Sequence, residues 1–241
     1  MPKDEIFKDS DADPGSFEFN ESVAEVFPDM LRRSIPGYDA SLEAIGTLAH
    51  RYVSPGTHCY DLGCSLGAAT LAMRRNIAGR NCHIVSVDLA PAMVERCRKR
   101  IDEGHSDTPV SVETADIRDI EIRNASMVVL NYTLQFLPVE DRIEMIRKIH
   151  DGLNRGGVLF LSEKVADDDP TVESLLVELH HAFKRTNDYS DLEIARKRSA
   201  LDKVLVPETI GIHLNRLEAA GFQHRSISLK YFNFVSILAI R

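Results

Sequence analysis

No apolar run in this 241-residue sequence approaches the length of a membrane span. The apolar runs are short pieces such as Met127 to Leu130 and Val158 to Leu161, whereas about 20 residues are needed to cross a bilayer. Residues 1–10 carry acids and lack an apolar core, so the sequence predicts neither a secretory signal nor a transit peptide. We therefore expect a cytoplasmic protein that does not engage a membrane.

Cysteine is scarce as well. The chain has four cysteines, and none belongs to a Cys-x-x-Cys pair. The histidines near them do not follow the spacing of a zinc site. We expect reduced thiols, with neither a disulfide framework nor a bound metal.

Positive charge is in deficit, since the formal net charge is −8 at pH 7. Proteins that bind nucleic acid usually carry a basic surface, because their affinity depends on neutralising phosphates. We therefore expect no stable, direct binding to nucleic acid. A hydrophobic content of 44% and a charged content of 27% are those of an ordinary folded protein.

Short apolar segments of strand type alternate with segments of helical period along most of the chain. This alternation predicts an α/β fold whose parallel sheet is covered on both faces. The expected strands are Cys59–Leu62, His83–Asp88, Val110–Thr114, Met127–Tyr132, Val158–Glu163, Arg225–Asn233 and Phe234–Ile240. The expected helices are Glu21–Arg33, Asp39–Arg51, Ala68–Asn76, Pro91–Arg100, Val139–Leu153 and Pro207–Ala220.

The end of the chain departs from the parallel pattern. The last two expected strands meet at Asn233 with no room for a crossover helix, so they form an antiparallel hairpin. Two stretches lie outside the core pattern: a helical N-terminal extension over residues 1–50, and a charged helical insertion over residues 164–206 before the last core helix. We expect one domain over residues 1–241, with the insertion as a lid or interface.

A glycine-bearing loop gives the sharpest signal. The chain reads Tyr-Asp-Leu-Gly-Cys-Ser-Leu-Gly-Ala-Ala-Thr from Tyr60 to Thr70, where a strand turns into a helix. Gly63 and Gly67 let the backbone turn tightly and let a ligand approach the helix start. The acid at Asp61 would repel a pyrophosphate but suits the ammonium of an amino-acid cofactor. An ordinary strand-turn-helix joint is the alternative interpretation.

Two more acids follow strand ends. Asp88 lies about 20 residues past the loop, where a carboxylate can accept both hydroxyls of a ribose; a helix-capping acid ahead of Pro91 is the alternative. Asp116 follows the third strand and is placed to accept from an adenine amino group, with Leu89 and Ile117 bracketing the ring. A surface turn acid is the alternative there.

The fourth strand ends near Asn131, at the sheet edge where open α/β folds bind ligands. This asparagine could instead satisfy a turn backbone. Together these motifs resemble the class I S-adenosylmethionine-dependent methyltransferases over roughly residues 55–241. The resemblance implies a Rossmann-like fold, with a seven-stranded, mostly parallel sheet that ends in an antiparallel hairpin, and S-adenosylmethionine as the ligand.

A closer resemblance covers nearly the whole chain. The segments that are similar to the carboxy-S-adenosylmethionine synthase family are Phe27-Pro28-Asp29-Met30, Arg33-Ser34-Ile35-Pro36-Gly37-Tyr38, the loop from Tyr60 to Thr70, Asn131 to Leu137, and Lys197-Arg198-Ser199. It implies that Arg198 holds the added carboxylate and is the catalytic candidate. The implied cofactor-binding residues are Tyr38, Gly63, Cys64, Ser65, Asp88, Leu89, Asp116, Ile117, Asn131 and Arg198.

The resemblance also implies a reaction and partners. S-adenosylmethionine and prephenate would give carboxy-S-adenosylmethionine and phenylpyruvate in a homodimeric enzyme. A separate tRNA carboxymethyltransferase would use the product on wobble uridine. No histidine–acid pair stands out in the sequence, and the fourth strand offers the neutral Asn131 in place of a base. Positioning and electrostatics would then carry the rate.

Arg198 lies in the long insertion, where a fixed guanidinium could hold carboxylates. The alternative is a solvated helix face on which the cations from Arg196 to Arg198 form ion pairs with Asp191 and Glu193. Cys64 is expected to be a small packed thiol and not a methyl acceptor. Other candidates for anion binding lie in the same insertion, although an amphipathic lid helix explains each more simply: His180, His181, Lys184 and Arg185.

Two other functions remain open from the sequence. One is a conventional methyltransferase that acts on a small molecule or on tRNA, although the net charge weighs against tRNA. The other is a non-catalytic S-adenosylmethionine-binding protein that uses residues 1–50 and 164–206 to contact partners. Turnover with prephenate separates all three.

Overall fold

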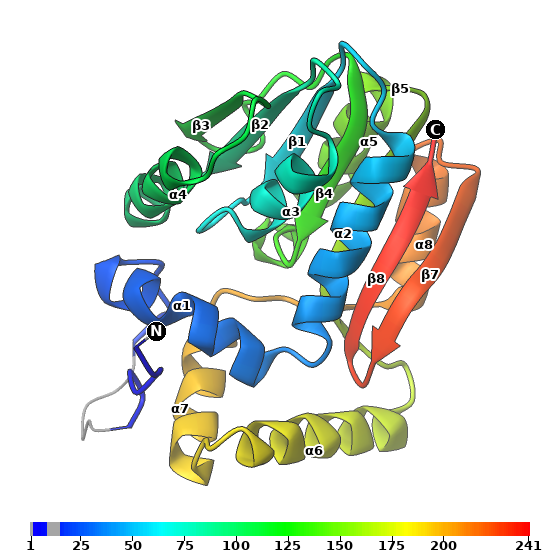
Figure 1. Cartoon of the computed structure of the whole chain (residues 1–241). Coiled ribbons are helices and arrows are strands. Elements are labelled where there is room, and N and C mark those ends of the chain that lie inside the picture. The colour runs from blue at the N-terminus through cyan, green and yellow to red at the C-terminus, as the bar shows by residue number, and fades with distance from the viewer. Residues whose placement is uncertain (1, 9–14) are drawn as a thin grey trace.

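Strands and helices follow one another in the predicted α/β order (Figure 1). The computed structural model describes residues 2–8 and 15–241; residues 1 and 9–14, part of the predicted N-terminal extension, lie outside the described residues. The main sheet has the strand order β3-β2-β1-β4-β5-β8-β7, and a short strand β6 pairs with β5. The strands are β1 (His58–Leu62), β2 (His83–Asp88), β3 (Val110–Thr114), β4 (Ala125–Asn131), β5 (Leu153–Ala166), β6 (Glu208–Thr209), β7 (His224–Tyr231) and β8 (Phe234–Ile240).

Helices connect the strands and cover the sheet. They are α1 (Glu21–Ser34), α2 (Tyr38–Tyr52), α3 (Ala68–Asn76), α4 (Pro91–Glu103), α5 (Arg142–Gly152), α6 (Pro170–Thr186), α7 (Asp191–Leu201) and α8 (Ile210–Ala219). Two short 3-10 turns, Leu134–Phe136 and Val139–Asp141, link β4 to α5. No helix among the described residues has the length and apolar character that a membrane crossing requires.

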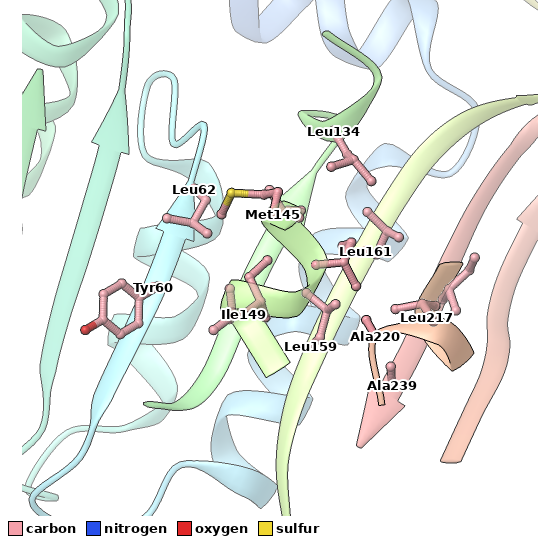
Figure 2. Packing of buried hydrophobic residues seen from close by; sticks show 14 of the residues in the cluster. Tyr60, Leu62, Leu134, Met145, Ile149, Leu159, Leu161, Leu217, Ala220 and Ala239 are labelled. Carbon is pink, nitrogen blue, oxygen red and sulfur yellow. The ribbon is translucent and has the colours of Figure 1, made fainter. Parts of the chain in front are cut away.

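Side chains alternate across the central strand β4, so that both faces of the sheet are buried. Val128 and Leu130 pack with α5 and α8, whereas Met127 and Val129 pack with α2 and α3. Figure 2 shows the first of these two clusters, between the sheet and helices α5 and α8. Burial on both faces explains why the parallel strands are continuous apolar runs in the sequence.

The C-terminal hairpin forms as predicted. Strand β8 is antiparallel to both β5 and β7, whereas β1 to β5 pair in parallel. Tyr231 pairs with Phe234, so Phe232 and Asn233 make the turn, with Phe232 at a φ of +52°. The predicted mostly parallel sheet with a C-terminal antiparallel hairpin is confirmed; all seven predicted strands form, and β6 adds a short eighth strand that the sequence did not predict.

The predicted helix Pro207–Ala220 begins later than expected. Thr209 caps α8 by accepting the backbone N–H of Ile212, so the helix starts at Ile210. Glu208 and Thr209 instead pair with the end of β5 as β6. Glu208 is buried against Arg142 of α5 and Arg216 of α8, and these ion pairs favour the extended pairing. No local pattern in the sequence predicts this strand.

Helices α1, α6 and α7 lie together beyond one end of the sheet, the end toward which β1, β4 and β5 run (Figure 1). Arg33 of α1 joins them: its guanidinium donates to the carbonyls of Asn187 (2.6 Å) and Asp188 (2.9 Å) between α6 and α7. The same group lies 4.0 Å from the ring centroid of Tyr189. Segments far apart in the sequence are thereby held opposite the carboxyl ends of the strands.

Candidate functional site

A cavity of about 750 Å³ opens between the carboxyl ends of the parallel strands and the helices α1, α6 and α7. Ligands bind at this edge in open α/β sheets, because the loops there diverge and leave space. All ten residues predicted to bind the cofactor line this one cavity: Tyr38, Gly63, Cys64, Ser65, Asp88, Leu89, Asp116, Ile117, Asn131 and Arg198.

The glycine loop after β1 makes the tight turn that its sequence predicts. Gly63 has a φ of +82° and Gly67 a φ of +77°, both in the left-handed region that favours glycine. A Cβ at Gly63 would overlap the side chain of Thr133. Two successive N–H groups, those of Gly63 and Cys64, donate to the carbonyl of Val87 at 2.8 and 2.9 Å. The loop is therefore tied to β2 and leaves its outer side to the cavity.

Two buried carboxylates hold this loop. Oδ2 of Asp61 accepts both the N–H and the hydroxyl of Thr70, and burial raises the pKa of Asp61 to about 6. Asp88 accepts the N–H of Ser65 at 2.8 Å and that of Ala90 at 2.9 Å. Burial raises the pKa of Asp88, and these backbone bonds partly offset that rise. Asp88 therefore holds two backbone N–H groups in place and also lines the cavity.

The residues expected to contact adenine line the same cavity. Leu89 is 67% exposed although it lines the cavity, whereas Ile117 is buried. The Asp116 carboxylate is held by Arg118, with Nε to Oδ1 at 3.0 Å and Nη2 to Oδ2 at 2.6 Å. This ion pair lowers the pKa of Asp116. An exposed apolar side chain beside an oriented carboxylate can bracket a purine ring.

Asn131 does not serve a turn. Its Oδ1 is buried and accepts no hydrogen bond from the described residues, although the residue lines the cavity. A buried acceptor without a donor is costly, so this atom is open to a ligand donor. Cys64 is 4% exposed, and the pKa of its thiol is raised by a hydrogen bond with Cys97 and by burial. It is a packed thiol, as predicted.

Arg198 lines the cavity from α7 and is 52% exposed at its side chain. Its Nε lies 3.5 Å from Oδ2 of Asp202, one helical turn later. The interpretation of this segment as a solvated face that answers Asp191 and Glu193 is wrong. Asp191 pairs with Arg185 on α6, and Glu193 forms a capping box with Ser190.

The other two cations of the Arg196 to Arg198 cluster have different surroundings. Arg196 donates to the carbonyl of Phe7 at 3.5 Å, away from the cavity. Lys197 is 3% exposed, with its Nζ 2.8 Å from Oγ of Ser34 and 3.3 Å from Oδ2 of Asp4. Burial lowers the pKa of Lys197 to about 8, although Asp4 opposes this shift. Lys197 thus joins α7 to α1 and to the N-terminal segment.

One face of α6 borders the cavity. Glu173, Val177, His180, His181 and Lys184 follow the three- and four-residue spacing of a helix face, and all of them line the cavity. Nε2 of His180 lies 2.8 Å from the carbonyl oxygen of Ser34, and burial lowers the pKa of His180 to about 3. Three of the four anion candidates in this helix therefore reach the cavity.

The fourth candidate does not line the cavity. Arg185 is half exposed and pairs with Asp191 at 2.7 Å. Sequence reasoning also missed a cation that does line it, Lys164 on β5. That residue directly follows a buried strand segment, and the carboxyl end of a parallel strand is where ligand contacts are expected. Lys164 could have been found by this rule.

Charge is divided across the cavity. The acids Asp61, Asp88 and Asp116 lie around the glycine loop and the ends of β1 to β3, whereas Lys164 and Lys184 lie at the end of β5 and on α6. Charged residues of the other sign line each side too, but they have partners within the chain: Arg100 donates to the carbonyl of Leu66, Arg118 pairs with Asp116, Glu173 accepts the N–H of Asp167, and Asp202 pairs with Arg198. One side is therefore suited to a ligand with hydroxyl, amino and ammonium groups. The other is suited to an anion.

Comparison with known proteins is consistent with this geometry. Residues 59–157 match the family described as a methyltransferase domain. The chain is 53% identical over 241 residues to the carboxy-S-adenosyl-L-methionine synthase of Haemophilus ducreyi, covering 100% of this chain and 99% of that protein. The protein of the same name from Enterobacter sp. is 52% identical over 239 residues, covering 99% of this chain and 97% of that protein.

Solved structures of lower identity share the fold. Human N-acetylserotonin methyltransferase, in complex with S-adenosylmethionine, is 16% identical with a TM-score of 0.60, covering 90% of this chain and 54% of that chain. A cyclopropane synthase from Mycobacterium tuberculosis is 20% identical with a TM-score of 0.56, covering 76% of this chain and 62% of that chain. These likenesses confirm the predicted class I methyltransferase fold.

Proposed function

Because this chain belongs to the carboxy-S-adenosyl-L-methionine synthase family, we propose that it converts S-adenosylmethionine and prephenate into carboxy-S-adenosylmethionine and phenylpyruvate. Membership confirms the family resemblance expected from the sequence, and the chain is an S-adenosylmethionine-dependent transferase. The observation that carries the proposal is the divided cavity, with acids around the glycine loop and, opposite them, two lysines whose ammonium groups have no partner among the described residues. Such a cavity suits a cation and an anion that react with each other.

The adenosyl half of the first substrate would lie against the glycine loop. Asp88 would accept the ribose hydroxyls with lone pairs left over from its two backbone bonds. Leu89 and Ile117 would bracket the adenine, whose amino group would reach Asp116. Asp61 would attract the ammonium, and the orphaned Oδ1 of Asn131 would accept a donor from the substrate. The three carboxylates are already held by hydrogen bonds or an ion pair within the chain.

The carboxylation itself needs little acid–base help from the protein. Decarboxylation of prephenate breaks the bond between its ring and a carboxyl carbon and expels hydroxide as phenylpyruvate forms. The hydroxide removes a proton from the sulfonium methyl group, which gives water and an ylid, and the ylid carbon bonds to carbon dioxide. A monocation and a dianion thus give a neutral product, the phenylpyruvate anion and water.

The protein supplies positioning and electrostatic stabilisation for these steps. Burial lowers the pKa of His180 to about 3, and its Nε2 lies 2.8 Å from the carbonyl oxygen of Ser34, so this histidine would be a poor proton acceptor. Arg198 would exchange its ion pair with Asp202 for the carboxylate that the methyl group gains. The helices α1, α6 and α7 would keep water from the ylid, because they cover the side of the cavity opposite the strands.

We extend the proposal to the setting of the reaction. The product would pass to a tRNA carboxymethyltransferase that modifies wobble uridine, and this chain would act as a cytoplasmic homodimer without binding tRNA stably itself. The net charge of −8 supports the last point, because phosphate binding requires the opposite sign.

Two measurements test the function. The purified protein is denatured and the released ligand is weighed by mass spectrometry; an adenosyl sulfonium compound is expected, and a nicotinamide or flavin would overturn the assignment. The protein is then incubated with S-adenosylmethionine and prephenate, with each omitted in turn as a control. Carboxy-S-adenosylmethionine and phenylpyruvate should form in equal amounts. Methyl transfer without prephenate would identify a conventional methyltransferase, and binding without turnover a non-catalytic protein.

A further inference from the structure

Lys184 of α6 is a buried cation without a counter-ion. It is 5% exposed, it lines the cavity, and its ammonium has no hydrogen-bond or ion-pair partner among the residues that the structure describes. Lys164 on β5 also lines the cavity, and its ammonium likewise has no partner within residues 2–8 and 15–241. Taking an ammonium out of water without a partner is costly. A carboxylate bound in the cavity would supply the missing charge for both ammonium groups.

The acids nearest to these lysines already have other partners. Asp4 lies 3.3 Å from Nζ of Lys197, and Asp202 lies 3.5 Å from Nε of Arg198. Oε2 of Glu173 accepts the backbone N–H of Asp167 at 2.8 Å. Among the residues that the structure describes, the pair is therefore not one half of an incomplete salt bridge. Its open positions face the cavity.

The pKa shifts of the two lysines also indicate that an anion binds between them and the cavity. Burial, together with the charges of Lys197, Lys164 and Arg198, lowers the pKa of Lys184 to about 7, although the charge of Asp4 opposes this shift. Burial likewise lowers the pKa of Lys164, with Arg198 acting in the same direction and Asp202 and Glu173 opposing. An arriving carboxylate reverses the balance, because an opposite charge favours the protonated amine.

We propose that Lys164 and Lys184 bind the carboxylate that the second substrate keeps, the one that remains on phenylpyruvate. This inference rests on the proposed function. A carboxyl group that must leave as carbon dioxide gains nothing from a strong ion pair, because binding that stabilises the ground state does not lower the barrier. The retained carboxylate is unchanged by the reaction, so it is the group that a fixed pair of cations can hold throughout. Arg198 is then left to the carboxylate on the sulfonium product.

The test uses phenylpyruvate as the probe, titrated by calorimetry into the protein loaded with S-adenosylmethionine. Lys184→Met and Lys164→Met should each weaken phenylpyruvate binding about 10- to 100-fold, as expected for loss of a charged hydrogen bond. Lys184→Arg should recover part of the affinity. Benzyl methyl ketone, which lacks the carboxylate, should bind the wild type and both methionine variants equally. At pH 8, proton uptake on phenylpyruvate binding should be present in the wild type and reduced in Lys184→Met.

Arg185→Gln is the matched control, because it removes one charge from the same helix at a residue that does not line the cavity. It should leave phenylpyruvate affinity unchanged. The melting temperature of Lys184→Met should equal or exceed that of the wild type, since an unpaired buried charge is removed. If Lys184→Met melts at a lower temperature and binds neither S-adenosylmethionine nor phenylpyruvate, Lys184 is a structural residue and the assignment is overturned.

Prephenate turnover by the wild type is measured separately. If turnover occurs and the Michaelis constant for prephenate rises in the two methionine variants while S-adenosylmethionine affinity is kept, the assignment holds. Unchanged phenylpyruvate affinity in both variants would overturn it and leave the proposed function standing. If the wild type neither turns over prephenate nor binds phenylpyruvate, the function and this inference fall together.

Discussion

The carboxylate of Asp88 accepts the backbone N–H of Ser65 at 2.8 Å, which ties the end of β2 to the glycine loop that follows β1. Its other oxygen accepts the N–H of Ala90 at 2.9 Å, at the start of α4. A carboxylate held by two backbone donors has its remaining lone pairs aimed before a ligand binds. Pre-orientation of this kind lowers the entropy cost of binding.

Asp88→Ala should therefore weaken S-adenosylmethionine binding by about 2–4 kcal/mol, roughly 30- to 1,000-fold, because two ribose hydroxyls lose a charged acceptor. Calorimetry measures the affinity, and circular dichroism checks the fold. Asp102→Ala, at an exposed position on α4, is the control and should bind normally. Unchanged affinity in a folded Asp88→Ala protein would place the ribose elsewhere.

Arg198→Ala should keep its affinity for S-adenosylmethionine and lose affinity for the carboxylated product by roughly 30-fold or more, because only the product presents a carboxylate to that guanidinium. Arg198→Lys should recover part of the loss, since an ammonium cannot form a bidentate pair. Calorimetry with both ligands measures the ratio. Equal weakening for both ligands would make Arg198 a general structural residue.

If product binding survives Arg198→Ala, the carboxylate anchor is another cation. The structure changes which ones should be tested next. Arg196 and Arg33 are poor candidates, because both guanidiniums donate to backbone carbonyls and neither lines the cavity. Lys164 and Lys184 line it and are the next candidates.

Gly63→Ala should destabilise the protein more than Gly79→Ala. Both glycines have a φ near +80°, at +82° and +74°, so each alanine carries the left-handed penalty of about 1–2 kcal/mol. A Cβ at Gly79 meets nothing within 4 Å, whereas a Cβ at Gly63 overlaps Thr133. Denaturant unfolding measures the difference, which should exceed about 1 kcal/mol. Equal losses would show that the loop relaxes around Thr133 without cost.

Glu163→Gln should remove a pH dependence of stability. Glu163 is fully buried, and burial raises its pKa to about 8 in the folded protein from an ordinary value of 4.5. Between these pH values the folded state keeps a proton that the unfolded state releases. Wild-type stability from this group is thus fully present below about pH 4.5 and is lost as pH rises toward 8, with a slope of at most about 1.4 kcal/mol per pH unit.

The measurement is thermal unfolding of both proteins between pH 5 and pH 8. The glutamine keeps the acceptor for the N–H of Leu134, which Oε1 of Glu163 accepts at 3.1 Å. The stability of Glu163→Gln relative to the wild type should therefore rise across this range. The wild type loses stability as pH rises, because its folded state keeps a proton that its unfolded state releases, whereas glutamine does not titrate. A constant difference would mean that Glu163 has an ordinary pKa in the fold.

Much of the fold follows from local patterns. The bounds of β2, β3, β8 and α3 agree with the sequence prediction at both ends. Continuous apolar runs specify strands that are buried on both faces, and the glycines of the loop specify a backbone conformation that other residues avoid. The ten predicted ligand residues line one cavity for a related reason: each lies at or near the end of a strand or in a segment that the family resemblance marks.

The sequence by itself determined the sheet, the hairpin and the cofactor loop, because these depend on periodicity and on glycine at fixed positions. Only the tertiary structure separated neighbours such as Lys184, which is buried at the cavity, and Arg185, which pairs with Asp191 outside it. It also decided which cations of α7 line the cavity and where β6 forms. Burial and charge pairing at these positions arise where α1, α6, α7 and β5 meet, and no local pattern encodes contacts between segments so far apart in the chain.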